Sequence, residues 1–371
     1  MNKKLISLLL SAALAVSMLT VPAFAAEGGE ADTALDETNE VVVTLGDTVT
    51  ASTVEDTGKA AADKTAADKT ETADSAPAAS TEKKQITYVA LGDSIVAGVG
   101  LADVKYAKDS TTLYSVDMSP NFKGYSPDCY VGKVAAMMGL DRDHAINLGL
   151  PALTAPDLAD MVRDGQMPKM NMESGCWYKY PEFQDYIRKA DVVSVQIGSN
   201  DAFVPCIVAL GNATNWKSEA LAASVLAGDL RASGSPAAAL IQGIKDMHLT
   251  RDERNATWNL LTSEMGKICD RIYPQTTAAL ISVVQEIRKL NPDCQILLMG
   301  YTDPVPFVPC WHNYFKKLNK FEKQLAETYD LTYVAIPKAK TDLDVHPTIS
   351  GHEYIAKKIV NSIELAEDSA Q

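Results

Sequence analysis

Three short segments that are apolar on both faces constrain the fold of this chain most strongly. They are Ile86–Leu91, Asp191–Ile197 and Gln295–Met299, and helical or polar sequence separates each from the next. Strands of a parallel sheet read as continuous apolar runs because crossover helices bury both of their faces. The alternation predicts an α/β domain in which helices cover a central parallel sheet. In such sheets, ligands bind beyond the carboxyl ends of the strands.

Composition divides the chain into three parts. Residues 1–25 carry Lys3 and Lys4, an apolar run and a final Ala-Phe-Ala, which is the pattern of a cleaved signal peptide, with a retained anchor as the alternative. Residues 26–84 are rich in Ala, Thr, Asp, Glu and Lys, so we expect a disordered stalk that cannot bury enough apolar surface to fold. Residues 85–371 are long enough for a single α/β domain, and we expect them to fold as one.

Export would place the mature protein outside the cell or at its envelope. We expect a monomer with no membrane span after cleavage. The six cysteines are an even number, which is compatible with three disulfides in an oxidising compartment, although several of them could instead be free buried thiols. No Cys-x-x-Cys or Cys/His pattern of a zinc site occurs, so we expect no metal and no cofactor. The formal net charge of -14 argues against nucleic acid or an anionic membrane as partner.

Two polar blocks follow predicted strands. Gly-Asp-Ser, ending at Ser94, comes directly after the first strand, and we expect it to open a helix whose free N–H groups lie beside the serine. Gly-Ser-Asn-Asp, residues 198–201, comes directly after the second strand, where the Asn200 amide can donate to an oxyanion. Both blocks would therefore lie at the same edge of the sheet.

A third block lies near the end of the chain. His346 stands in Asp-x-His-Pro, just before Ser350-Gly-His-Glu353. A serine followed three residues later by glutamate is the pattern of a capping box, so we expect Ser350 to open the last helix. That helix would fix the loop that carries His346.

The order Gly-Asp-Ser, Gly-x-Asn-Asp and Asp-x-His-Pro resembles the SGNH/GDSL hydrolases over about residues 86–363. The resemblance implies a flavodoxin-like three-layer α/β sandwich and action on esters, thioesters, lipids or acetylated sugars. It implies that Ser94 is the nucleophile and His346 the general base, and that the Ser94 N–H and the Asn200 side chain are oxyanion donors. Such a pair forms an acyl-enzyme that water then hydrolyses.

The third oxyanion donor departs from the family pattern. The family's second block usually reads Asn-x-x-x-x-Gly and supplies a backbone N–H from its glycine, whereas this chain has Asn147-Leu-Gly-Leu-Pro-Ala152. By spacing the donor is the Ala152 N–H, and Gly149 is the alternative if residue type decides. A backbone donor requires glycine only where φ is positive. We therefore prefer Ala152.

The acid of the triad also departs from the pattern. Many family members carry aspartate three positions before the histidine, where this chain has Leu343. Asp344 is the better match, and Asp342 or a main-chain carbonyl are the alternatives for orienting His346.

The sequence thus predicts a secreted carboxylic ester hydrolase, either a lipase or an esterase, whose substrate is a small-molecule, lipid or acylated glycan ester. A carbohydrate deacetylase or an acyltransferase on the same fold stays open. A non-catalytic envelope or glycan-binding module is the rival from another class. No Gly-x-Ser-x-Gly elbow occurs, which argues against the α/β-hydrolase fold.

Overall fold

The computed structural model of the protein describes residues 85–101, 125–226, 233–304, 309–341 and 346–364. The predicted signal peptide and stalk lie outside the described residues, as do Asp342 and Asp344. The described part belongs to one compact unit.

A parallel sheet of five strands, in the order β2-β1-β3-β4-β5, forms the centre of the domain. The strands are β1 (Tyr88–Gly92), β2 (Ala145–Gly149), β3 (Val192–Gln196), β4 (Gln295–Met299) and β5 (Thr332–Val334). Every residue of β1, β2 and β3 is buried, which explains why the predicted strands are apolar on both faces. The predicted parallel sheet is confirmed, with β1, β3 and β4 as the three strands that were expected.

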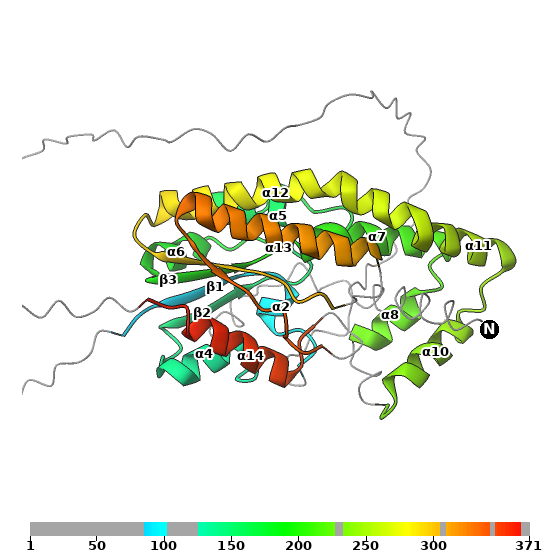
Figure 1. Ribbon diagram of the computed structural model, residues 1–371, viewed down its shortest axis with the longest axis horizontal. Coiled ribbons are helices and arrows are strands. Elements are labelled where there is room, and N and C mark those ends of the chain that lie inside the picture. The colour runs from blue at the N-terminus through cyan, green and yellow to red at the C-terminus, as the bar shows by residue number, and fades with distance from the viewer. Residues whose placement is uncertain (1–84, 102–124, 227–232, 305–308, 342–345, 365–371) are drawn as a thin grey trace, which may run out of the picture. The chain divides into compact units, whose positions relative to one another are not determined.

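Helices cover both faces of the sheet (Figure 1). On one face lie α5 (Ala155–Asp164), α6 (Phe183–Lys189), α12 (Met265–Leu290) and α13 (Pro309–Tyr329). On the other face α4 (Tyr130–Met138) packs against α14 (Ile349–Val360). The predicted three-layer α/β sandwich is therefore present.

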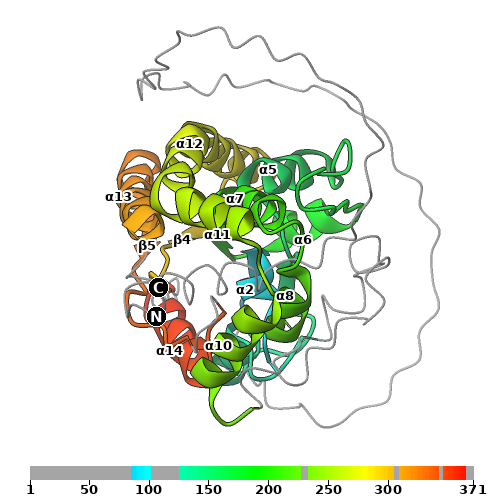
Figure 2. The same cartoon turned by 90° about the vertical axis from the view of Figure 1, so that its right-hand side faces the viewer.

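The remaining helices gather beyond the carboxyl ends of the strands (Figures 1 and 2). They are α2 (Ser94–Ala97), α7 (Ser199–Ala213), α8 (Glu219–Leu226), α10 (Pro236–Asp246) and α11 (Arg251–Asn259), and a π-helical turn, Leu260–Glu264, joins α11 to α12. Leu221 of α8 and Leu240 of α10 form a small apolar cluster apart from the main core. This edge of the sheet thus carries the long insertion between β3 and β4.

The last helix begins earlier than the sequence pattern indicates. Its N-cap is Thr348, whose Oγ1 accepts a hydrogen bond from the Gly351 N–H at 3.1 Å. The prediction of a capping box at Ser350 and Glu353 is therefore wrong, and Glu353 instead pairs with Lys357 at 2.6 Å. Threonine can cap as well as serine, and here only Thr348 has the extended backbone that a cap requires.

All six cysteines are free thiols, and all six lie within the described residues. Five are buried and Cys310 is half-buried. The expected three disulfides are therefore not formed in this structure. The alternative that the sequence left open, buried thiols that pack as small apolar side chains, describes what is found.

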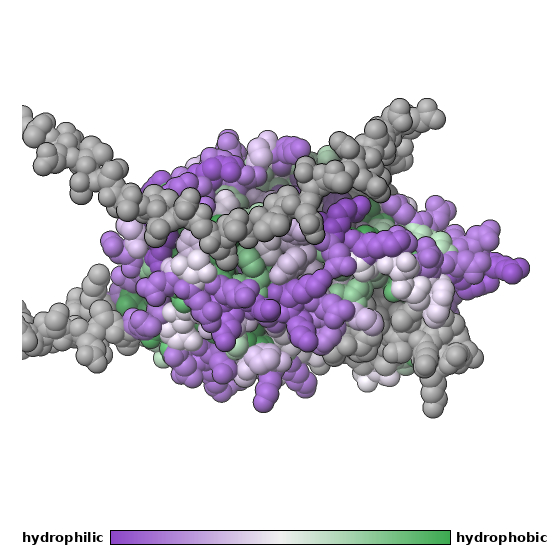
Figure 3. Space-filling view, turned by 45° about the horizontal axis from the view of Figure 1, so that its top comes forward, coloured by the Kyte–Doolittle hydropathy of each residue, from purple (hydrophilic) through white to green (hydrophobic). Residues whose placement is uncertain are grey.

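Hydrophilic residues predominate on the face drawn in Figure 3, with apolar residues showing only in small groups. Within the described ranges, no helix is both long and apolar enough to cross a membrane.

Candidate active site

A tight turn at the end of β1 presents Ser94. Gly92 has φ of +152°, and a Cβ at this position would lie 2.1 Å from the Gln196 carbonyl oxygen of the neighbouring strand, so only glycine fits. Asp93 caps α2, since its Oδ1 accepts the Ile95 N–H at 2.9 Å. Ser94 is the first residue of that helix, where backbone N–H groups have no partner within the helix. The predicted helix start beside the serine is confirmed.

His346 lies beside this serine. Its Nε2 lies 3.0 Å from the Ser94 Oγ, although 252 positions separate the two residues. Ser94 is 8% exposed and His346 is 1% exposed. A hydroxyl and an imidazole nitrogen at this distance are within reach of proton transfer, in surroundings that largely exclude water.

Gly149, the alternative oxyanion donor, is occupied elsewhere. Its N–H donates to the Asn147 Oδ1 at 2.9 Å, and the Asn147 side chain in turn donates to the Val96 carbonyl at 2.9 Å. A Cβ on Gly149 would lie 2.3 Å from the Ala97 nitrogen. This glycine therefore permits α2 to pack against the end of β2, and its N–H is not available to a ligand.

Ala152, the preferred donor, has φ of +62° and is buried. The left-handed backbone costs a residue other than glycine about 1 kcal/mol, whereas glycine would adopt it without that strain. No hydrogen bond from the Ala152 N–H to another described residue is found. The alanine thus holds, at some cost, the backbone conformation that glycine adopts freely.

The start of α7 anchors the loop that carries Ala152. The Asn200 Nδ2 donates to the Leu153 carbonyl at 2.9 Å, and the Asp201 Oδ2 accepts the Ala155 N–H at 2.9 Å. Burial raises the pKa of Asp201 to about 7, partly offset by its hydrogen bonds. One Nδ2 hydrogen of Asn200 still has no part in the Leu153 contact and can serve a ligand.

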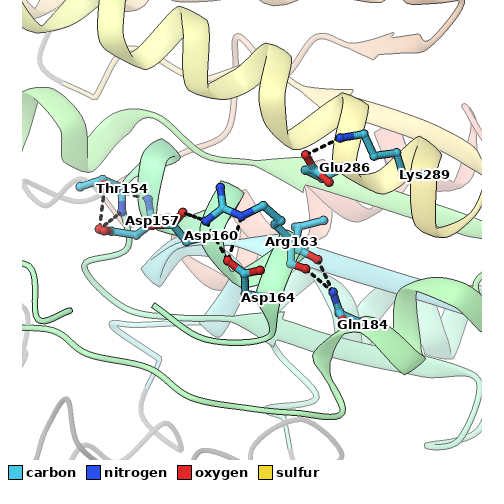
Figure 4. A network of polar contacts seen from close by, with 9 residues as sticks. Thr154, Asp157, Asp160, Arg163, Asp164, Gln184, Glu286 and Lys289 are labelled. Carbon is cyan, nitrogen blue, oxygen red and sulfur yellow. Dashed lines mark hydrogen bonds and ion pairs between the residues drawn. The ribbon is translucent and has the colours of Figure 1, made fainter. Parts of the chain in front are cut away.

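The loop ends at the capping box of α5 (Figure 4). The Thr154 side chain accepts from the Asp157 N–H, and the Asp157 carboxylate accepts from the Thr154 N–H at 3.2 Å. Hydrogen bonds therefore hold this loop to the start of α7 and to the first turn of α5.

Sequence reasoning missed the contacts of Asp93. The Asp93 Oδ2 accepts the Ser199 hydroxyl at 2.6 Å and the Tyr301 hydroxyl at 3.2 Å. Burial raises the pKa of Asp93, and these hydrogen bonds, the Ile95 N–H and the nearby His346 lower it. Tyr301 lies two residues after the end of β4, so the rule that directs attention to residues after each strand could have found it.

Three of the other four histidines make contacts away from Ser94. His352 is buried in α14, and its Nδ1 accepts the Tyr130 N–H at 3.2 Å. His312 and His144 each lie 2.7 Å from an aspartate, at Asp303 and Asp141. Across the described part of the chain, no group of three or more His, Cys, Asp or Glu side chains is arranged to hold a metal ion.

The sequence matches the profile of the GDSL-like lipase/acylhydrolase family over residues 90–354. The match spans most of the chain, and the protein belongs to this family. It is therefore an α/β protein of the SGNH/GDSL hydrolase class, as the sequence motifs predicted. A comparison with curated protein sequences gives no match.

Solved structures of the same class resemble the chain at low sequence identity. A lipase from a goat rumen metagenome is 14% identical, with a TM-score of 0.42, and the alignment covers 75% of this chain and 97% of the lipase. Phospholipase A1 from Streptomyces albidoflavus is 16% identical, with a TM-score of 0.41 and 75% and 100% covered. A mutant acetyl-xylooligosaccharide esterase from Geobacillus is 18% identical, with a TM-score of 0.37 and 77% and 97% covered.

Proposed function

We propose that this chain is an exported carboxylic ester hydrolase, a lipase or esterase, that works through an acyl-enzyme on Ser94. The observation that carries the proposal is the buried contact of 3.0 Å between the Ser94 Oγ and the His346 Nε2 at the carboxyl edge of the sheet. Serine hydroxyls are weak nucleophiles unless an adjacent base takes their proton, and this contact supplies that base. Membership of the acylhydrolase family agrees with the reaction class.

In the first step, His346 takes the Ser94 proton while the Oγ attacks the ester carbonyl. The carbonyl oxygen becomes an oxyanion, which the Ser94 N–H, the Ala152 N–H and the Asn200 Nδ2 would stabilise by donating hydrogen bonds. His346 then returns the proton to the leaving alcohol. Water repeats the cycle on the acyl-enzyme and releases the acid.

The group that orients His346 is proposed from the sequence, because residues 342–345 lie outside the described residues. Asp344 is the preferred acid, with Asp342 and a main-chain carbonyl as alternatives. A carboxylate on the far side of the imidazole would favour the protonated ring that forms during attack.

The test is hydrolysis of p-nitrophenyl esters from acetate to palmitate by residues 26–371, comparing wild type with Ser94→Ala. We expect Ser94→Ala to abolish turnover while the protein stays folded. Ser263→Ala is the matched control, because Ser263 is an exposed serine far along the chain, and it should retain wild-type rates. Activity that survives Ser94→Ala would overturn the mechanism.

The chain-length profile then decides between a lipase and an esterase for short acids. If the whole series is silent, labelling by a serine-reactive phosphonate separates two outcomes. Labelling at Ser94 would indicate a more specialised glycan ester or an acyl acceptor other than water, and no labelling would indicate a binding module without catalysis.

A further inference from the structure

We propose that Asp93 is a positioning residue for this reaction, whose carboxylate locks the Ser94 turn to the Asn200 turn and places a negative charge near His346. The inference rests on the proposed function and adds to it a residue outside the Ser-His-acid set and the oxyanion donors. Asp93 is fully buried, directly before the nucleophile.

The hydrogen bonds of Asp93 come from separate parts of the fold. Its Oδ1 accepts the Ile95 N–H at 2.9 Å in the first turn of α2. Its Oδ2 accepts the Ser199 hydroxyl at 2.6 Å and the Tyr301 hydroxyl at 3.2 Å. These groups follow β1, β3 and β4, so one carboxylate joins three adjacent strand ends at the carboxyl edge of the sheet.

The Ser199 contact bears directly on the oxyanion side. Ser199 is the first residue of α7, and the next residue, Asn200, donates to the Leu153 carbonyl in the loop that carries Ala152. A chain of contacts thus runs from the nucleophile turn through Ser199 and Asn200 to that loop. Loss of the Asp93 carboxylate would let the nucleophile and the donors move relative to each other, and small displacements of this kind lower turnover strongly.

The donors around Asp93 fit its ionised form. An ionised carboxylate only accepts hydrogen bonds, and an N–H and two hydroxyls are aimed at it here. Burial raises the pKa of Asp93, and these donors oppose that shift. The hydrogen bonds therefore favour the charged form of Asp93, while its burial disfavours that form.

The titratable groups that act on Asp93 are His346, Tyr301 and, from α4, Tyr130. Both tyrosines are buried, and their pKa values are raised well above the ordinary value, so they stay neutral. Among these groups, only His346 gains a positive charge during attack, and the Asp93 carboxylate would attract that charge. A carboxylate near an imidazolium favours its formation, in addition to any acid at Asp344 or Asp342.

The experiment measures kcat, KM and the pH dependence of kcat/KM for Asp93→Asn, Ser199→Ala and Tyr301→Phe with the ester that wild type prefers. We expect Asp93→Asn to lower kcat by about 10- to 100-fold while KM changes little. We also expect the acidic limb of its pH profile to move down by about one pH unit, because a charge near the imidazole is gone. A purely structural role would lower activity without moving that limb.

Ser199→Ala keeps the carboxylate and breaks only its shortest bond. We expect kcat to fall about threefold to tenfold with the acidic limb in place, and Tyr301→Phe to have a smaller effect in the same direction. If Asp93→Asn does not fold, the Ser199→Ala result decides, and unchanged kcat there overturns the proposal. Wild-type kcat and an unmoved limb in a folded Asp93→Asn also overturn it, whereas activity in Ser94→Ala would overturn the proposed function itself.

Discussion

Two buried carboxyl groups in this domain have opposite surroundings. Asp93, at the carboxyl edge of the sheet, accepts hydrogen bonds from Ile95, Ser199 and Tyr301. Glu322, in the middle of α13, is equally buried, yet neither of its side-chain oxygens has a hydrogen-bond partner among the described residues. Burial raises the pKa of both groups, but only at Asp93 do donors oppose the shift. The surroundings of Asp93 supply donors that favour a charged carboxylate, whereas those of Glu322 supply none and favour a neutral acid.

Hydrogen-bond donors decide whether a buried carboxyl group can carry a charge. A buried carboxyl without donors costs stability whenever it must ionise, and it therefore keeps its proton. A buried carboxyl with donors can stay charged and act on neighbouring groups. The difference lies in the donors that each environment supplies, since burial is the same in both.

After Ser94→Ala, the largest expected effect is at the proposed oxyanion donor Asn200. Asn200→Ala should lower kcat by about 100- to 1000-fold, because it removes a donor that the proposed mechanism aims at the oxyanion. The measurement is steady-state hydrolysis of the preferred ester, with thermal unfolding as the check on folding. If kcat falls less than threefold in a folded variant, Asn200 is only an anchor for the Leu153 carbonyl, to which its Nδ2 donates at 2.9 Å.

Asp344 is the third carboxyl group of interest, and it lies outside the described residues. Asp344→Asn should lower kcat less than Ser94→Ala does, by about 10- to 100-fold if a main-chain carbonyl shares in orienting His346. Asp342→Asn, the matched control two residues away, should change kcat less than twofold. The assignment of the acid would be reversed if Asp342→Asn proved the more damaging of the two.

The next prediction concerns stability at Glu322. Glu322→Leu should raise the free energy of unfolding by about 1–3 kcal/mol at pH 8, because it removes an unpartnered polar group from the interior. The pKa of Glu322 is raised in the folded state, so its proton is bound more tightly there than in the unfolded chain. Its contribution to stability is therefore complete below the unfolded pKa of about 4.3 and is lost as pH rises.

Urea unfolding at pH 5 and pH 8 measures this effect. The gain from Glu322→Leu should be larger at pH 8 than at pH 5, and ester hydrolysis should be unchanged. Asp201, whose pKa burial raises to about 7, retains a dependence of the same sign in both proteins. The same substitution at Glu327, an exposed glutamate of α13, should shift stability by less than about 0.5 kcal/mol. An equal gain at both pH values would mean that Glu322 has a partner in solution.

The smallest expected effect concerns the backbone at Ala152. Ala152→Gly removes the cost of φ at +62° but gives the unfolded chain more freedom, so stability should change by less than about 1 kcal/mol. Because glycine keeps the backbone N–H, kcat should stay within about threefold of wild type. Ala152→Val provides the contrast, since a β-branched residue in this conformation should destabilise the protein clearly.

Local patterns made part of the fold predictable. β1, β3 and β4 are apolar on both faces, which the sequence reports directly. β2 escaped notice because Asn147 stands at its centre, where the side chain binds the Val96 carbonyl of a segment 51 positions away. The start of α14 was misplaced by two residues, because serine is by type at least as good a cap as threonine and the backbone conformation decides in favour of Thr348.

The candidate site was predictable to a similar degree. Ser94, Asn200 and His346 follow from short motifs, and the structure brings Ser94 and His346 into contact. The contacts of Asp93 did not follow, because Tyr301 lies 208 positions away and its hydroxyl meets the carboxylate only in the folded sheet. Positive φ at Ala152 was equally hidden, since alanine gives no sign of the conformation that it adopts.

The distance along the chain between Ser94 and His346 has a consequence for synthesis. Ser94 begins α2, directly after the first described strand, whereas His346 comes just before α14, whose His352 accepts a hydrogen bond from the Tyr130 N–H of α4 at 3.2 Å. A growing chain that has not yet produced residue 346 lacks the base altogether. If the proposed mechanism holds, no acyl-enzyme can form through this pair until residue 346 has been synthesised and α14 has packed against α4.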